Sequence, residues 1–71
     1  MAETNKTYDV VFNDDTNSNS KGFKECLEYC INWVNNRNGS TESYFPDYIG
    51  GTVSVVCNET GDTYITKPIL N

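Results

Sequence analysis

The chain contains no histidine, which removes the usual general base of nucleophilic catalysis. Without an imidazole, neither a Ser-His-Asp triad nor a Cys-His pair can be assembled. Acid–base chemistry with two carboxylates needs a pair held in differing environments. Asp14 and Asp15 are neighbours in a polar stretch, and Glu25 and Glu28 lie near Lys21 and Lys24 in a pattern typical of a solvated surface. We therefore expect no enzymatic activity, no catalytic residue and no cofactor.

Basic residues are scarce, with five against ten carboxylates and a net charge of −5. This balance gives no basic surface for a phosphate backbone, so direct nucleic-acid binding is not expected. Two explanations of the acidity stay open. It serves solubility, or it attracts the chain to a basic protein surface, such as that of a nucleic-acid-binding protein.

Long hydrophobic runs are absent, and no stretch approaches the roughly 18 apolar residues that a membrane span requires. No charged n-region precedes an apolar h-region, so we expect no signal peptide and no membrane association. The three cysteines make an odd number, which is not the disulfide framework of a small secreted protein. The sequence therefore predicts a cytoplasmic protein, and its 71 residues suffice for a single domain.

The cysteines are the first candidates for a metal site. Cys26 and Cys30 are four apart in a predicted helix, and Cys57 lies in a predicted strand. Structural zinc takes four ligands, commonly as two Cys or His pairs, and this chain has no second pair. Core packing of all three thiols is the favoured interpretation, because free cysteine behaves as a small buried hydrophobe. A small Cys-ligated metal-binding protein remains an alternative.

Residues 15–26 resemble the beginning of a calcium loop, with Asp15, Asn17 and Asn19 at alternating positions. Ser20 stands where that loop requires glycine, and Cys26 stands where it requires a bidentate glutamate. Asn/Ser-rich turns are common without any ion. We therefore predict no metal site here.

The chain does contain one stretch with sustained helical periodicity, residues 21–37. Ser18 or Ser20 is expected to cap its beginning, and Gly39 to end it. One apolar stripe is formed by Phe23, Leu27, Ile31 and Val34, and it is widened by Cys26, Cys30 and Trp33.

Alternating patterns predict strands at residues 8–13, 52–57 and 62–67, whereas residues 1–6 are expected to fray and residues 14–20 to form a loop. The predicted order is β-α-β-β, a single small α+β domain with one helix packed on a three-stranded mixed or antiparallel sheet. We expect a right-handed crossover to carry the chain from the first strand through the helix to the second. The third strand is expected either between the other two or at an edge, and the middle position is favoured.

Aromatic side chains are the remaining candidates for function. Residues 40–51 either fold their rings back over the core or present them as a binding surface. Exposed rings inside an acidic surround have the anatomy of a binding hot spot. The candidate partner-binding residues are Tyr29, Trp33, Tyr44, Phe45 and Tyr48.

We expect a small acidic non-enzymatic protein-binding module, because the chain is short, is negatively charged and lacks catalytic groups. The most concrete form is a stoichiometric inhibitor or accessory protein of phage or mobile-element type, for example against a bacterial defence system. The Asn- and Tyr-rich, Arg-poor composition is also typical of AT-rich coding. A homodimeric structural or assembly protein, using a sheet edge or exposed rings on itself, is the alternative.

Overall fold

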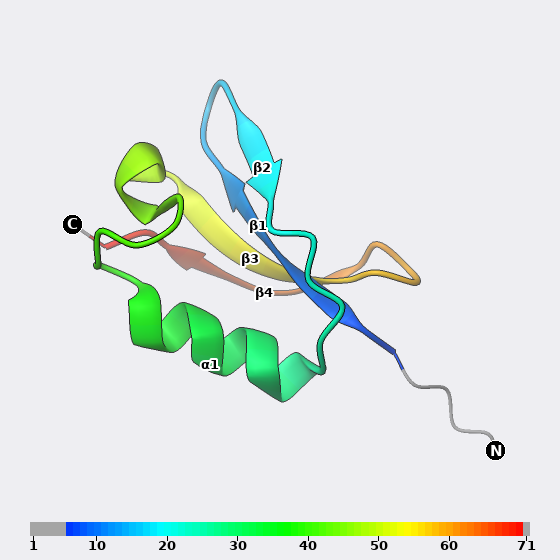
Figure 1. The fold of residues 1–71 in the computed structure, drawn as a ribbon. Helices are drawn as coiled ribbons and strands as arrows, with labels where there is room; N and C mark the ends of the chain where they lie inside the picture. Colours follow the sequence, from blue (N-terminus) through cyan, green and yellow to red (C-terminus); the bar gives the residue numbers. More distant parts are fainter. Residues whose placement is uncertain (1–5, 71) are drawn as a thin grey trace, which may run out of the picture.

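The structure is a computed structural model that describes residues 6–70. It is a single small α+β domain in which one helix covers a four-stranded antiparallel sheet (Figure 1). The predicted fold class is confirmed, with one strand more than expected. The prediction that residues 1–6 fray lies outside the described residues except for Lys6, which is exposed. The elements are β1 (Tyr8–Asn13), β2 (Ser18–Ser20), α1 (Leu27–Arg37), the 3-10 helix η1 (Phe45–Tyr48), β3 (Thr52–Cys57) and β4 (Thr63–Pro68).

The sheet has the order β2-β1-β3-β4, and every pair is antiparallel. The strands predicted at 8–13 and 52–57 match β1 and β3, and the third is displaced by one residue. The alternation in β3 buries Val53, Val55 and Cys57 against the helix side, as an alternating pattern requires. The favoured middle position of the last strand is wrong, and the edge alternative holds, because β3 lies between β1 and β4.

A hairpin replaces most of the predicted loop at 14–20. The Asp14 carboxylate accepts hydrogen bonds from the backbone N–H of Thr16 (2.8 Å) and of Asn17 (2.7 Å), which closes the turn. The chain then pairs back onto β1, with Val11 opposite Ser20. The three residues of β2 are all exposed, so no hydrophobic alternation marks them as a strand.

The helix begins at Leu27, six residues later than predicted. Residues 21–26 run alongside β1 instead of forming a helical turn, because their backbone N–H groups donate hydrogen bonds to β1. The Tyr8 and Glu25 backbones exchange two hydrogen bonds (2.7 and 3.3 Å), and the Phe23 N–H donates to the buried carboxylate of Asp9 (2.8 Å). Capping by Ser18 or Ser20 is therefore wrong. Cys26 occupies the N-cap and provides no side-chain cap.

This extended segment also explains why the predicted crossover is wrong. Since Glu25 pairs with Tyr8, the chain has already returned to the beginning of β1 when α1 starts. A helix of 11 residues spans about 16 Å, close to the roughly 20 Å of a six-residue strand. The helix therefore carries the chain to the far end of β1, and β3 must run antiparallel to β1 (Figure 1).

The buried residues of α1 are Cys30, Trp33 and Val34, so burial is shifted from the predicted stripe, of which Val34 is a member, toward Cys30 and Trp33, which were expected to widen it. Leu27 and Ile31 are only partly buried beside them. The shift follows from the late start of the helix, because Phe23 reaches the core edge from the extended segment instead of from the first helical turn.

Phe12 is the centre of the core. Its side chain has no exposed surface, and it contacts four other rings edge-on or stacked. Ring-centroid distances to Phe12 run from 4.8 Å for Phe45 to 6.2 Å for Trp33. Aromatic pairs of this kind stabilise a fold by more than the burial of their apolar area alone. This extra contribution is useful in a chain with few aliphatic residues. The partners of Phe12 are Trp33, Tyr44, Phe45 and Tyr48.

Candidate partner-binding surface

The five candidate partner-binding rings separate into two groups. Phe45 (0% exposed), Tyr48 (4%) and Trp33 (9%) belong to the core, so of the two alternatives left open for these rings the fold-back one holds and they are not exposed anchors. These three rings pack against Phe12, and they fill a core that has few aliphatic side chains. Tyr44 is half-buried, and Tyr29 is exposed at 45% of its surface.

A row of rings nevertheless reaches the surface where α1 meets the extended segment. Phe23 packs edge-on against Tyr29 (6.0 Å between centroids) and against Trp33 (5.2 Å). We call Tyr29, Phe23, Trp33 and Tyr44 the aromatic band. Its outer members are predicted binding residues, whereas Phe23 was assigned to the helix core by its spacing. Only the extended conformation of residues 21–26 could have revealed its place.

Two of the five basic residues of the chain lie over this band. The Lys21 ammonium is 5.9 Å from the Trp33 ring centroid and 5.1 Å from that of Tyr44. The Arg37 guanidinium is 5.1 Å from the Trp33 ring. Cations at these distances are attracted by the ring faces. Sequence reasoning missed both residues, because they come together only through the fold.

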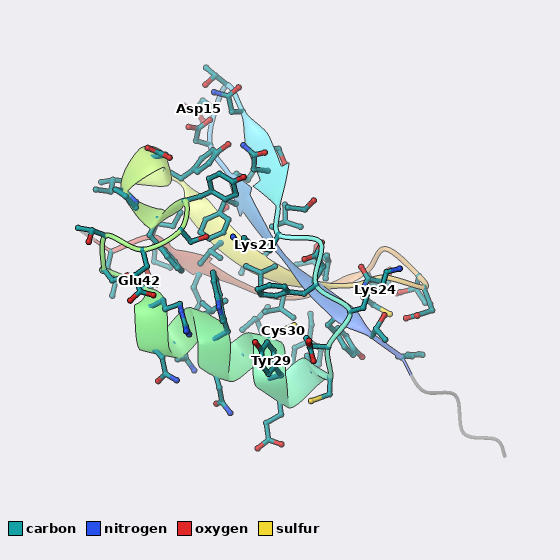
Figure 2. The ribbon with its side chains drawn as sticks, viewed as in Figure 1. Asp15, Lys21, Lys24, Tyr29, Cys30 and Glu42 are labelled. Carbon is teal, nitrogen blue, oxygen red and sulfur yellow. The ribbon has the colours of Figure 1, made fainter. Side chains whose placement is uncertain are left out.

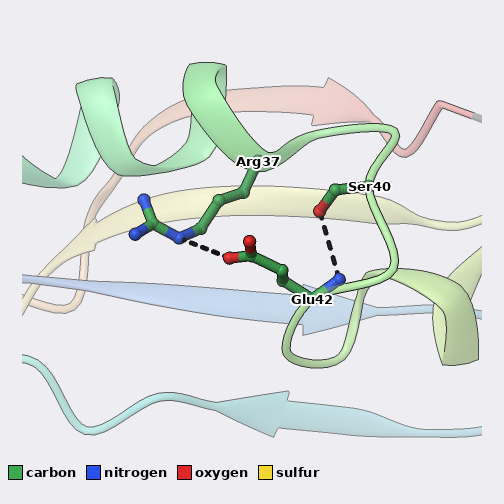
Figure 3. Close-up of polar contacts among 3 residues, drawn as sticks. All are labelled: Arg37, Ser40 and Glu42. Carbon is green, nitrogen blue, oxygen red and sulfur yellow. Dashed lines mark hydrogen bonds and ion pairs between the residues drawn. The ribbon is translucent and has the colours of Figure 1, made fainter.

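Arg37 is held in place by the loop that follows α1. Its Nε donates to the Glu42 Oε1 at 3.1 Å, and the Glu42 backbone N–H donates to the Ser40 Oγ at 3.2 Å (Figure 3). Figure 2 shows Glu42 beside the C-terminal end of α1. Surface ion pairs contribute only about 0–1 kcal/mol to stability. The contact links the guanidinium that lies over Trp33 to the loop after α1.

A shallow depression of about 200 Å³ lies on this face of the helix. Trp, Tyr and Arg are the residue types that most often dominate binding energy at protein interfaces. No carboxylate lines the depression, although carboxylates outnumber bases two to one in the chain. The lining residues are Tyr29, Asn32, Trp33, Asn36 and Arg37.

The thiols do not form a common site. Cys26 is exposed, Cys30 and Cys57 are buried, and residues 6–70 contain no group of three His, Cys, Asp or Glu that could hold a metal. Burial raises the pKa of the Cys30 thiol to about 11, and its Sγ donates to the Tyr8 carbonyl at 3.3 Å. Core packing is therefore correct for Cys30 and Cys57 and wrong for Cys26.

Asp15, Asn17 and Asn19, the alternating residues of the calcium-like stretch, fall in the β1–β2 hairpin. Asp15 lies at its tip (Figure 2), and the Asn19 side chain donates to the Tyr48 hydroxyl at 2.7 Å. The backbone amides that this turn offers are bound by Asp14, and they hold the pKa of that carboxyl below its usual value. The stretch has a structural role in the hairpin.

A second polar cluster joins three segments at the opposite end of β1. The Glu59 carboxylate accepts from the Thr7 backbone N–H (2.9 Å) and hydroxyl (3.1 Å). The Asn58 amide donates to the Thr7 hydroxyl (3.0 Å) and to the Phe23 carbonyl (2.9 Å). The Thr7 amide lowers the pKa of Glu59. We call Thr7, Asn58 and Glu59 the clasp.

The fold and the surface together define a small α+β domain with an aromatic and cationic helix face. Comparison of the chain with protein-family models, with curated proteins and with solved structures found no match in any of the three. Among residues 6–70, no helix has the length and apolar character needed to cross a bilayer.

Proposed function

We propose that the protein is a non-enzymatic protein-binding module that acts by occupying a partner's surface. The aromatic band, with Lys21 and Arg37 over Trp33, is the observation that carries this proposal. It combines an exposed tyrosine, a partly accessible tryptophan and an oriented arginine on one helix face. These are the groups that supply most binding energy in protein interfaces.

The proposed mode of action is that of a stoichiometric inhibitor or accessory protein of phage or mobile-element type, working in the cytoplasm. Three free thiols and the AT-rich coding character support this setting. The net charge of −5 favours encounter with a basic protein, such as one that binds nucleic acid. Carboxylates at the hairpin tip (Asp15) and in the β3–β4 turn (Glu59, Asp62) stand clear of the aromatic band and would steer the encounter.

Affinity capture from a bacterial lysate tests the proposal, with Tyr29→Ala as the variant. We expect the unchanged chain to recover a partner in stoichiometric amount and Tyr29→Ala to lose it, because Tyr29 is the most exposed ring of the band. Tyr64→Ala is the matched control, since Tyr64 is exposed to a similar degree (58%) but lies on β4. Recovery of no stoichiometric partner, or loss of the partner in Tyr64→Ala alone, would contradict the proposal.

A further inference from the structure

We propose that the depression on α1 receives a short segment of a protein partner in which a single carboxylate lies beside an apolar side chain. This inference rests on the proposed function and names the chemistry that the same surface recognises. The carboxylate would meet Arg37, and the apolar side chain would pack on Tyr29 and on the part of Trp33 that lines the depression.

The two cations over the aromatic band have hydrogen-bonding capacity that the described residues do not use. Glu42 engages only the Nε of Arg37, and the terminal nitrogens make no hydrogen bond to any side chain or carbonyl of residues 6–70. Within the same part of the chain, no carboxylate lies within ion-pairing distance of Lys21. With its Nε bound to Glu42 and both terminal nitrogens left unpaired by the described residues, the Arg37 guanidinium is suited to bidentate binding of a carboxylate.

The other end of the depression, at Tyr29, offers an apolar surface. Tyr29 is 45% exposed, and its ring is fixed edge-on by Phe23, so it presents a rigid apolar surface at little entropic cost. Asn32 and Asn36 lie between Tyr29 and Arg37 in the lining. Their amides each offer donors and an acceptor, which suits the backbone of a bound peptide.

The charge of the whole chain restricts the segment further. Ten carboxylates would repel a densely acidic partner, whereas one carboxylate can meet the terminal nitrogens of Arg37, whose Nε is bound to Glu42, with the Lys21 ammonium nearby over the Trp33 ring. Screening at physiological salt limits the more distant charges to a range of about 8 Å. The surface therefore selects for an isolated carboxylate among apolar residues and against a run of acids.

Selection from a library of displayed random peptides, with the full chain as bait, tests the inference. We expect enriched peptides to share one Asp or Glu next to a Leu or an aromatic residue. Trp33 is the single tryptophan of the chain, so its fluorescence reports binding at the site directly. An enriched peptide without tryptophan and its Glu→Gln (or Asp→Asn) counterpart are then titrated. The loss of a charged hydrogen bond should weaken binding about tenfold or more.

Arg37→Gln and Lys21→Gln should each weaken binding of the acidic peptide and leave binding of its amide counterpart unchanged. Lys24→Gln is the matched control, because Lys24 is exposed on the same extended segment but lies away from the aromatic band (Figure 2). Circular dichroism confirms that each variant is folded. Two independent variants keep the test decisive if one of them does not fold.

Enrichment of basic peptides, or of none, would overturn the inference, as would equal binding of the acidic and amide peptides. The inference and the proposed function fail in different ways. If Tyr29→Ala abolishes binding while Arg37→Gln and Lys21→Gln do not, the surface still binds protein but the carboxylate is not what it recognises. If the chain captures no partner from lysate, the proposed function itself fails.

Discussion

At the scale of single residues, Phe12 has the largest consequence for stability. Truncation of a buried phenylalanine to alanine costs about 3–5 kcal/mol, and a single core below about 70–80 residues supplies little more than that. We therefore expect Phe12→Ala to be largely unfolded at 25 °C, since it removes the partner of four rings. Phe12→Leu should remain folded with a smaller loss. Urea denaturation followed by circular dichroism measures both, and a stable Phe12→Ala would contradict the central role of this ring.

Cys30 gives a second prediction at this scale, from its burial and its pKa of about 11. The thiolate is the reactive form, so Cys30 should resist alkylation in the native state while exposed Cys26 reacts. Mass spectrometry of partially labelled protein assigns the sites. Because the folded pKa lies above the ordinary value of 9.0, the unfolded chain loses this proton first, and stability should fall as pH rises from 9.0 toward 11. Equal labelling of Cys30 and Cys26 in native protein would contradict this account.

At the scale of elements, the beginning of α1 shows what periodicity can and cannot predict. The spacing of apolar residues located the helix and its end, but it extended the helix through residues 21–26. Those residues are held extended by bonds to Tyr8 and Asp9, which are distant in sequence. A pattern within one segment carries no information about such partners, so the aromatic band that depends on Phe23 could not be predicted.

The N-terminus of α1 offers a prediction about stability. Cys26 holds the N-cap position without accepting a hydrogen bond from the first helical turn. Serine is close to cysteine in size and its hydroxyl can accept that bond, so Cys26→Ser should stabilise the protein by about 1 kcal/mol. Cys26→Ala is the matched control, since it removes the thiol without supplying an acceptor. Thermal denaturation of the three proteins measures the difference, and equal midpoints for serine and alanine would contradict the capping argument.

Other elements were open to prediction in different degrees. The apolar side chains that alternate along β1 and β3 were sufficient to locate both strands, although Asp9 is also buried on the other face of β1. The β2 strand has no buried side chain, so its sequence resembles a loop. For η1, composition required that some rings be buried, and the fold-back interpretation was correct. Which rings stay exposed depends on which of them pack against Phe12. The spacing of residues along the chain carries no information about these contacts.

At the scale of the whole molecule, both edges of the sheet carry features that oppose strand addition. The β2 edge is only three residues long. The β4 edge ends in Pro68, contains a register shift, and turns Lys67 inward to bond the Asn35 side chain at 2.7 Å. Natural proteins use short strands, bulges, proline and inward-pointing charges to prevent edge-to-edge pairing.

We therefore expect the protein to be a monomer, contrary to the homodimeric alternative. Light scattering across a concentration series up to the millimolar range checks this. A mass that doubles with concentration would contradict it. If a dimer forms and Tyr29→Ala dissolves it, the aromatic band would be a self-association surface, whereas a dimer unaffected by that change would point to the sheet edges.

The clasp joins three segments of the chain at one end of β1, and it should make stability depend on acid. Glu59 joins the residue before β1 to the β3–β4 turn, and Asn58 extends this link to Phe23 in the segment before α1. The pKa of Glu59 is lowered from its ordinary 4.5 by the Thr7 amide. A carboxyl whose folded pKa is depressed contributes stability that is present above its unfolded pKa and lost as pH falls through the folded one. The clasp should therefore stabilise the protein at pH 7 and cease to do so in acid.

The difference between the unchanged chain and Glu59→Gln isolates this contribution. Lowering the pH also reduces the net negative charge and its self-repulsion, which favours the compact state, but this affects both proteins alike. Urea denaturation should show the unchanged chain more stable than Glu59→Gln at pH 7, with the gap closing toward pH 3. Asp62→Asn, in the same exposed turn but outside the clasp, should show no such gap at either pH. A gap for Glu59→Gln that persists undiminished in acid would mean that the carboxylate's charge is not what closes the clasp.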